Sequence, residues 1–525
     1  MRFFEILPAS LAWLTIVLML VFSRFFPEWV SIFIILFDTY WLLKTIYLSF
    51  HLRATFVAMK RNMKIDWLAK LEEARDKRPA FVETTAGRQG ISKESSISHD
   101  WRDIYHLVIL PMYNEPYEVV RDSFATLARV HYPKEKLMVV LALEERAGAP
   151  AEEVGKRIQK EYGHLFGKFL VTVHPAGLPG EIPGKGSNES FAAACAKELL
   201  AGDAGFDPCR VLVSVFDVDT QVFPEYFGRL AYVFLNAPHP LRSIYQPVPL
   251  FTNNIHEAPT FARVVSFSAT FWQMMQQSRP ERLTSFSSQA IPLQTLIEIG
   301  FWQRDMVSED SRIFWQGYLR YHSDFRVEPL LFPVSMDAAV APTFWGTIKS
   351  LYKQQRRWAW GSENVPYILN GFRNDPAISA KKKWYWSFNA IEGYHSWATN
   401  SLMIFALGWL PLTLGGGHFN HTLLSYSLPH VTRFIISLSM IGIASSAILS
   451  FTLLPPKPSG LGVSDYLIYF LQWALMPFTL IAFGTLPAME AQTRLALGGK
   501  WRLGFWVTPK SRSTRQGISD KGLGL

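Results

Sequence analysis

The chain has 525 residues, 14% of them aromatic, a formal net charge of +9 and only two cysteines. So few cysteines exclude a disulfide-rich secreted scaffold and fit a reducing cytosol. Long apolar runs lie near both ends of the chain, which excludes a chain made only of soluble domains. Anionic lipid headgroups are therefore the expected counter-charges, and nucleic acid is not expected as a partner.

Two apolar runs open the chain, at 4–26 and 29–50. Each is long enough to cross a hydrocarbon core about 30 Å thick. A cleaved signal peptide is the alternative interpretation of the first run, but no small-x-small cleavage site is evident and a second run follows directly. We expect two transmembrane helices in 1–50. Residues 51–100 then form a juxtamembrane segment and linker, whose early basic residues place the next domain in the cytoplasm.

Residues 101–344 alternate short apolar runs with amphipathic stretches, a pattern typical of a mostly parallel sheet with helices on both faces. The sequence therefore predicts an α/β domain inserted between transmembrane helices. Strands are expected at 106–111, 137–143, 169–173 and 211–216, and helices at 117–130, 151–162 and 188–200.

Ligands of such sheets bind beyond the carboxyl ends of the strands. Polar side chains follow three of the expected strands: Asn114 and Glu115, Glu144 and Glu145, and Asp217 and Asp219. This convergence predicts an active site at that edge of the sheet.

Asp217-Val218-Asp219 leaves a buried strand, so both carboxylates are expected to face the crevice. Carboxylate oxygens suit a hard divalent cation, Mg²⁺ or Mn²⁺, which would bridge to a donor diphosphate. A solvated turn with an Asp cap on the helix near Pro224 is the alternative. The other motifs of the chain favour the metal.

Ser308-Glu309-Asp310 supplies a candidate base. Inverting sugar transfer needs one carboxylate to take the proton of an attacking hydroxyl. Asp310 is the expected catalytic residue and Glu309 the second candidate. The same residues also fit a helix start before 312–321, and the two interpretations are compatible.

Gln354, Arg357 and Trp358 share one face of an amphipathic helix at 345–361. Arg357 would offset charge on a leaving diphosphate, and Trp358 would stack on a sugar ring. An interfacial helix is the alternative, with its Arg and Trp at the lipid headgroups.

Earlier in the chain, Lys185 lies in a Gly-rich turn before a helix, a weak phosphate-binding motif that a flexible turn explains equally well.

Interfacial helices are expected over 345–395, and three apolar runs follow within 396–490. The last run, 464–487, contains Pro477 and Pro487, so a broken, re-entrant or interfacial helix competes with a full crossing. A basic tail forms 491–525.

In this order the motifs resemble those of membrane-embedded family-2 glycosyltransferases with the GT-A fold, such as the cellulose synthase catalytic subunit and hyaluronan synthase. The resemblance implies a nucleotide contact at Glu144 or Glu145, and acceptor contacts near Ser288. Asp217 and Asp219 match its Asp-x-Asp, Asp310 the base of Thr-Glu-Asp, and Gln354, Arg357 and Trp358 its Gln-x-x-Arg-Trp motif. Phe505, Thr508 and Lys510 match the gating loop that closes over the nucleotide.

The implied function is inverting, metal-dependent transfer of a sugar from a UDP-sugar to a growing polysaccharide, with secretion. The expected setting is a multi-pass inner-membrane protein with a cytoplasmic catalytic domain. The expected partners are a nucleotide-sugar donor, a glycan or lipid-linked acceptor and membrane lipids; secretion subunits and a homo-oligomer both stay open. A non-processive enzyme acting on a lipid or polyprenyl phosphate is the alternative. A transporter or scaffold with a degenerate transferase domain is disfavoured by the intact acids.

Overall fold

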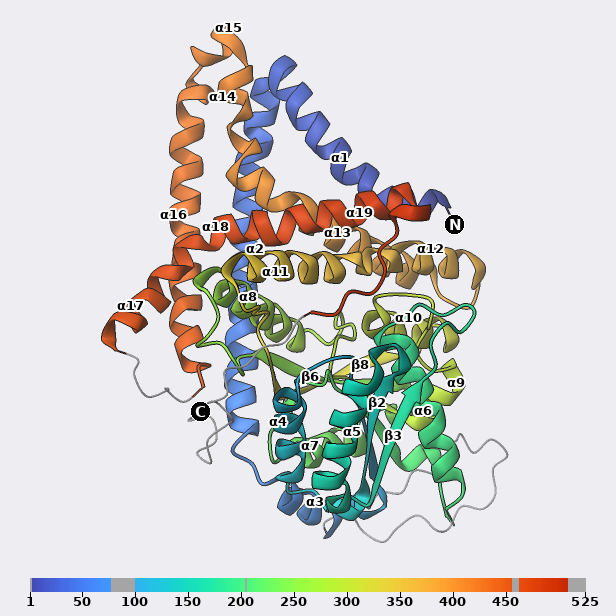
Figure 1. Cartoon of the computed structure of the whole chain (residues 1–525). Coiled ribbons are helices and arrows are strands. Elements are labelled where there is room, and N and C mark those ends of the chain that lie inside the picture. The colour runs from blue at the N-terminus through green and yellow to red at the C-terminus, as the bar shows by residue number, and fades with distance from the viewer. Residues whose placement is uncertain (1, 77–99, 204, 456–461, 509–525) are drawn as a thin grey trace.

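The computed structural model describes residues 2–76, 100–203, 205–455 and 462–508, and shows an α/β domain beneath a helical bundle (Figure 1). Residues 77–99 of the expected juxtamembrane segment and linker, 51–100, lie outside the described residues. Within the described ranges, four helical stretches are long and apolar enough to span a membrane, and a fifth if the bent pair Ala380–Phe405 and Leu407–Leu414 is one span. The four are α1 (Arg2–Phe25), α2 (Pro27–Asn62), α16 (Leu423–Thr452) and the stretch Ser464–Leu497.

The α/β domain is built on one sheet, with the strand order β3-β2-β1-β4-β7-β6-β8-β5. Four strand pairs are parallel, and the short β7 joins the two parallel groups by antiparallel pairing with β4 and β6. The predicted fold class, a GT-A-type α/β domain between membrane-length helices, is confirmed by this topology. The strands are β1 (Tyr105–Pro111), β2 (Leu137–Glu144), β3 (Lys168–His174), β4 (Val211–Val215), β5 (Gln221–Val222), β6 (Ser243–Phe251), β7 (Ala290–Pro292) and β8 (Arg326–Met336).

Helices cover both faces of the sheet because alternate strand residues point to opposite sides. Val108 and Leu110 of β1 pack under α4 (Tyr117–Ala128), α5 (Gly148–Tyr162) and α7 (Tyr226–Asn236). Leu107 and Ile109 pack on the other side with α6 (Lys185–Ala201), α9 (Leu293–Ile299) and α10 (Glu309–Arg320). Both faces of β1 are therefore buried, which explains its continuous apolar run.

A third apolar core joins the domain to the bundle. It combines Leu52 and Met59 of α2 with α8 (Thr260–Gln277), Leu351 of α11 (Phe344–Ala359) and Phe483. In Figure 1, α11 and the last helix, α19 (Leu486–Leu497), run across the direction of α2 and α16. The remaining helices are α3 (Trp67–Asp76), α12 (Asn364–Asn374), α13 (Ala380–Phe405), α14 (Leu410–Leu414), α15 (Gly416–Asn420), α17 (Val463–Leu471) and α18 (Met476–Thr479).

The run that contains Pro477 and Pro487 is helical but changes its winding. A 3-10 turn at Gln472–Leu475 precedes α18, and a π-helical segment at Leu480–Thr485 separates α18 from α19. Proline has no N–H and clashes with the preceding turn, so such local changes are expected beside it.

Candidate active site

Lys185 lies at the centre of the acidic residues. It is the first residue of α6 and is buried, and its Nζ lies 2.8 Å from Asp217 Oδ1. It also donates to both carboxyl oxygens of Asp310, at 3.0 and 2.7 Å. Burial alone would lower the pKa of Lys185, but the charges of Asp217 and Asp310 raise it well above its ordinary value. Lys185 is therefore an ammonium that joins the end of β4 to the start of α10.

Asp219 is fully buried and held in place. Its Oδ2 accepts the backbone N–H of Asp337 at 2.9 Å. Asn253 donates to the carbonyl oxygen of Asp219 at 2.9 Å and to Asp337 Oδ1 at 3.0 Å. With Asp217 beside it, Asp219 offers the fixed carboxylate oxygens that Mg²⁺ or Mn²⁺ prefers, so the donor set fits the expected ion.

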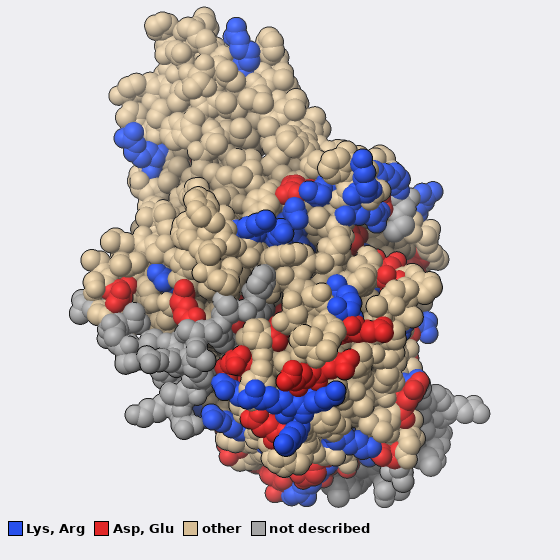
Figure 2. Space-filling model, in the orientation of Figure 1, with Lys and Arg blue, Asp and Glu red and all other residues tan. Residues whose placement is uncertain are grey.

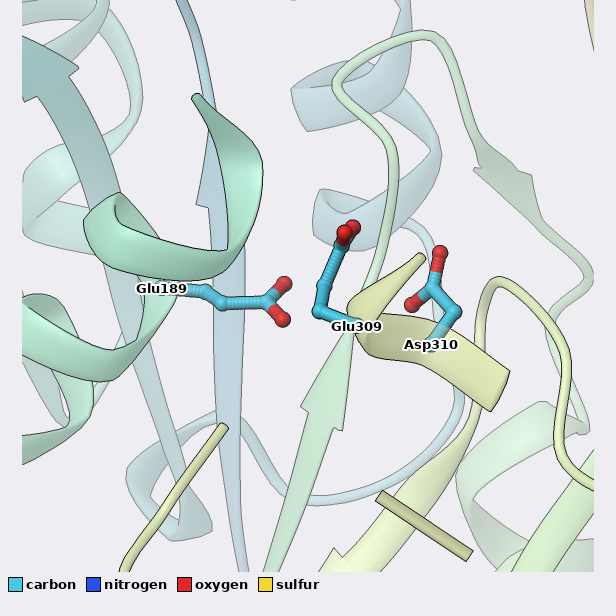
Figure 3. Close-up of side chains that lie close together, drawn as sticks. All are labelled: Glu189, Glu309 and Asp310. Carbon is cyan, nitrogen blue, oxygen red and sulfur yellow. The ribbon is translucent and has the colours of Figure 1, made fainter. Parts of the chain in front are cut away.

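Three carboxyl groups gather at the start of α10. Figure 3 shows Glu189 of α6 pointing toward Glu309 and Asp310, and one oxygen of each lies within 4.8 Å of the others. Burial, then the charge of Asp310, raises the pKa of Glu309 to about 8, and burial also raises the pKa of Glu189 well above its ordinary value. Burial and the charge of Asp217 raise the pKa of Asp310, against the opposing effect of Lys185. Glu309 and Glu189 therefore favour their protonated forms here, whereas Asp310 is paired with the Lys185 ammonium.

Ser308 precedes α10 but its side chain does not cap the helix. Its hydroxyl donates instead to Glu363 at 2.7 Å. The start of α10 is thus tied to the segment that follows α11, which holds Asp310 between the sheet and the bundle.

The helix α11 presents Gln354, Arg357 and Trp358 to the same space. The Trp358 ring packs between Phe251 and Phe286, with centroids 5.7 and 5.9 Å away. The Arg357 guanidinium lies 5.1 Å from the ring centre of Phe505 in the tail. The motif therefore forms a wall with an aromatic and a cationic part.

The tail packs directly on the turn before α6. Gly184 has φ +153°, and a Cβ placed there would lie 2.5 Å from the Phe505 ring. Only glycine leaves room for Phe505 at this position. Lys510, the last residue matched to the gating loop, lies outside the described residues.

These groups line one cavity of about 970 Å³, which continues between α2, α8, α13 and α16. It brings together most of the candidate residues: Glu115, Glu144, Lys185, Asp217, Asp219, Glu309, Asp310, Gln354, Arg357, Trp358, Phe505 and Thr508. Figure 2 shows the largely uncharged surface of the bundle above the charged α/β domain.

Three candidates do not line this cavity. Asn114 is exposed, and Glu145 is exposed and accepts the backbone N–H of Ala176 at 2.8 Å. Ser288 is fully buried at φ +66°, with its hydroxyl against Met336 Sδ. Of the two consecutive glutamates at the end of β2, Glu144, the last residue of the strand, reaches the cavity, where Arg146 holds it at 2.5 Å.

Sequence reasoning missed Glu189, Asn253 and Asp337. Glu189 follows Lys185 by four residues, a spacing that places both on one helix face and was available as a signal. Asn253 and Asp337 carry no local pattern, because they reach Asp219 only through the pairing of β6 with β8.

The sequence matches no protein-family model and no curated protein. Among solved structures, it is similar to a mannosyltransferase from Pyrobaculum calidifontis in complex with GDP-Man and Mn²⁺, at 15% identity and a TM-score of 0.37, over 83% of this chain and 97% of the other. It is also similar to residues 1–349 of S. aureus TarS in complex with UDP-GlcNAc, at 12% identity and a TM-score of 0.35, over 67% and 93%. Both similarities are too distant to transfer conclusions to this chain.

Proposed function

We propose that the protein is a membrane glycosyltransferase that moves a sugar, with inversion, from a nucleoside diphosphate sugar such as a UDP-sugar to a growing polysaccharide. One observation carries the proposal. A base candidate, a fixed pair of acids and a cationic–aromatic wall, on elements far apart in sequence, line one cavity that continues into the helical bundle.

In the proposed reaction, Asp310 takes the proton of the acceptor hydroxyl. The hydroxyl oxygen bonds to the anomeric carbon as the bond from that carbon to the diphosphate breaks, and the electron pair leaves with the diphosphate. Lys185 already holds both oxygens of Asp310. A diphosphate would draw the Lys185 ammonium away and so free Asp310 to accept the proton.

The remaining groups bind and orient. Arg357 faces the leaving diphosphate, and Trp358 provides a stacking surface for the acceptor sugar. A divalent ion held by Asp217 and Asp219 would offset the charge of the diphosphate. Phe505 covers the turn that carries Lys185, so the tail excludes water from the donor side.

The secretion part of the proposal rests on the upper cavity. Between α2, α13 and α16 its lining combines aliphatic side chains, such as Ile404 and Ile435, with aromatic and polar ones, among them Trp41, Trp397, Asn400 and Ser439. Such a lining suits a sugar chain, whose rings stack on aromatic faces and whose hydroxyls need hydrogen bonds.

The test is Asp310→Asn. We expect transfer to fall by about 10²–10⁴-fold, because the amide keeps the shape but cannot take the proton, while nucleotide binding by calorimetry stays close to wild type. Asp305→Asn, an exposed acid in the preceding loop, is the matched control. Transfer by Asp310→Asn at the control rate would refute the proposed base. Sizing the products from a radiolabelled nucleotide-sugar panel tests the polymer: a single sugar on a lipid would support the non-processive alternative.

A further inference from the structure

The cavity has a second charged end, where α2, α8 and α13 meet. Lys44, Arg279, Arg282 and Glu392 line it. Lys44 and Glu392 form an ion pair at 3.0 Å, and Glu392 also interacts electrostatically with Arg282. Lys44 and Arg282 thus share the carboxylate of Glu392. We call this end, defined by Lys44, Arg279 and Arg282, the basic mouth.

Arg279 is the least satisfied of these cations. It is 93% buried, yet its Nε has no hydrogen-bond partner among the described residues. Its nearest carboxylate, Glu281, lies 3.8 Å away and is 61% exposed, so solvent weakens that pair. Arginine does not lose its proton. Arg279 also lines the cavity, and a buried guanidinium this weakly paired beside a cavity indicates an anion as the missing partner.

With Pro27 placed at one face of the hydrocarbon core, the basic mouth falls at the depth of the headgroups on the other face. Measured from Pro27, Lys44 and Tyr47 lie about 26 and 30 Å along α2 at 1.5 Å per residue, close to the thickness of a hydrocarbon core. Tyr47 packs under Arg279, with the guanidinium 5.5 Å from its ring centre, and is itself 50% exposed. The cavity-lining Trp272 is also exposed, so this end reaches the protein surface where lipid would lie.

The basic mouth also belongs to the acceptor side of the candidate active site. The loop 278–289 carries Arg279 and Arg282, and further along it Ser285 donates to the backbone oxygen of Asp310 at 2.5 Å. The next residue, Phe286, packs against Trp358. Lys185 and Gly184, on the donor side, come from α6 and the turn before it.

We propose that the basic mouth binds the phosphate of a membrane lipid, held by Arg279 and Arg282 beside Lys44. Two guanidinium forks match the oxygens of a phosphate, and the depth selects a lipid over a soluble phosphate. That this lipid is presented to the acceptor side rests on the proposed function; the binding itself does not.

The experiment measures binding without any nucleotide sugar. Native mass spectrometry of the full-length protein in an uncharged detergent is titrated with short-chain phosphatidic acid. Diacylglycerol of the same chains lacks only the phosphate, and inorganic phosphate serves as competitor. We expect phosphatidic acid to bind wild type, and Arg279→Gln/Arg282→Gln to weaken it about tenfold or more. Diacylglycerol should bind all forms weakly.

Two further variants keep the test decisive. Arg53→Gln removes an exposed cation from the same helix, outside the cavity, and should bind like wild type. Arg282→Gln alone leaves the buried Arg279 in place and should lose part of the affinity, which covers the case in which the double variant does not fold. Wild-type affinity in a folded double variant would overturn the proposal. Displacement of the lipid by equimolar inorganic phosphate would overturn its lipid part. Failed sugar transfer with intact lipid binding would refute only the proposed function.

Discussion

The two ends of the cavity differ in how their charged side chains are paired. At the donor end, Lys185 is surrounded by carboxyl groups and contacts Asp217 and Asp310 within 3 Å. At the basic mouth, Lys44 and Arg282 share Glu392, and the Arg279 Nε has no hydrogen-bond partner within the described part of the chain. The first end is neutralised from within the chain, whereas at the second end Arg279 has only the exposed Glu281, 3.8 Å away, as an ion-pair partner among the described residues.

This difference predicts where substitutions act. A buried ion whose partners are inside the protein contributes mainly to folding, because its removal leaves those partners uncompensated. A buried ion without an internal partner contributes mainly to ligand affinity. Substitution of Lys185 at the donor end should therefore lower the stability of the fold, and substitution of Arg279 at the basic mouth should weaken ligand binding.

Lys185→Met should have the largest effect, and it tests the pairing of charges at the donor end. Methionine keeps the length but leaves the acids around position 185 without their cation. We expect the free energy of unfolding to fall by about 3–5 kcal/mol, measured by denaturant unfolding in detergent. Lys156→Met removes an exposed lysine whose partner, Glu152, lies 3.9 Å away, and should change stability little. Equal, small effects of both would show that the donor end is not held by Lys185.

The next effect concerns the tail that closes the donor end. Gly184→Ala places a methyl group 2.5 Å from the Phe505 ring in a backbone conformation that favours glycine. We expect the tail to detach, seen as faster hydrogen exchange over 503–508 and weaker nucleotide binding. Gly180→Ala has a left-handed φ of +80° but meets nothing within 4 Å, so it separates backbone strain from the clash. In the double variant Gly184→Ala/Phe505→Ala the clash with the Phe505 ring is absent. If nucleotide binding were weaker in this double variant than in Gly184→Ala alone, the clash would not be the cause of the weaker binding.

The sequence predicted the first half of the sheet and missed the second half for a physical reason. β1 to β4 are rich in aliphatic residues and free of internal proline, but β6 contains Pro247 and Pro249, and proline argues against a strand because it cannot donate to the ladder. The fold tolerates them through a register shift between Gln246 and Val248. The Gln246 side chain replaces lost ladder bonds, accepting from Phe286 N–H at 2.8 Å and donating to the Ser287 carbonyl at 3.0 Å.

The candidate site divides in the same way. Residues grouped in short motifs, such as Asp217 and Asp219 or Arg357 and Trp358, were found from spacing. The bridging position of Lys185 was not, because a lysine in a Gly-rich turn has many uses and only tertiary packing brings Asp310 to it. No sequence pattern pointed to Arg279, because its proposed role depends on its burial and on the lack of a hydrogen-bond partner for its Nε among the described residues, which only the folded structure shows.

The smallest expected effect concerns Glu309. It tests whether a proton bound to this side chain reduces the negative charge around Lys185. Burial, then Asp310, raises the pKa of Glu309 from an ordinary 4.5 to about 8. The folded chain therefore holds more protons than the unfolded chain between these values, so Glu309 lowers stability progressively as pH rises through that window. Glu309→Gln removes the titrating group. We expect wild type to lose on the order of 1–3 kcal/mol relative to Glu309→Gln between pH 5 and pH 8.5, in unfolding curves taken across that range. Glu118→Gln, at an exposed site, should follow the wild-type curve. If the stabilities of wild type and Glu309→Gln changed with pH in parallel, Glu309 would ionise freely. The negative charges of the surrounding carboxylates would then have to be offset by Lys185 alone.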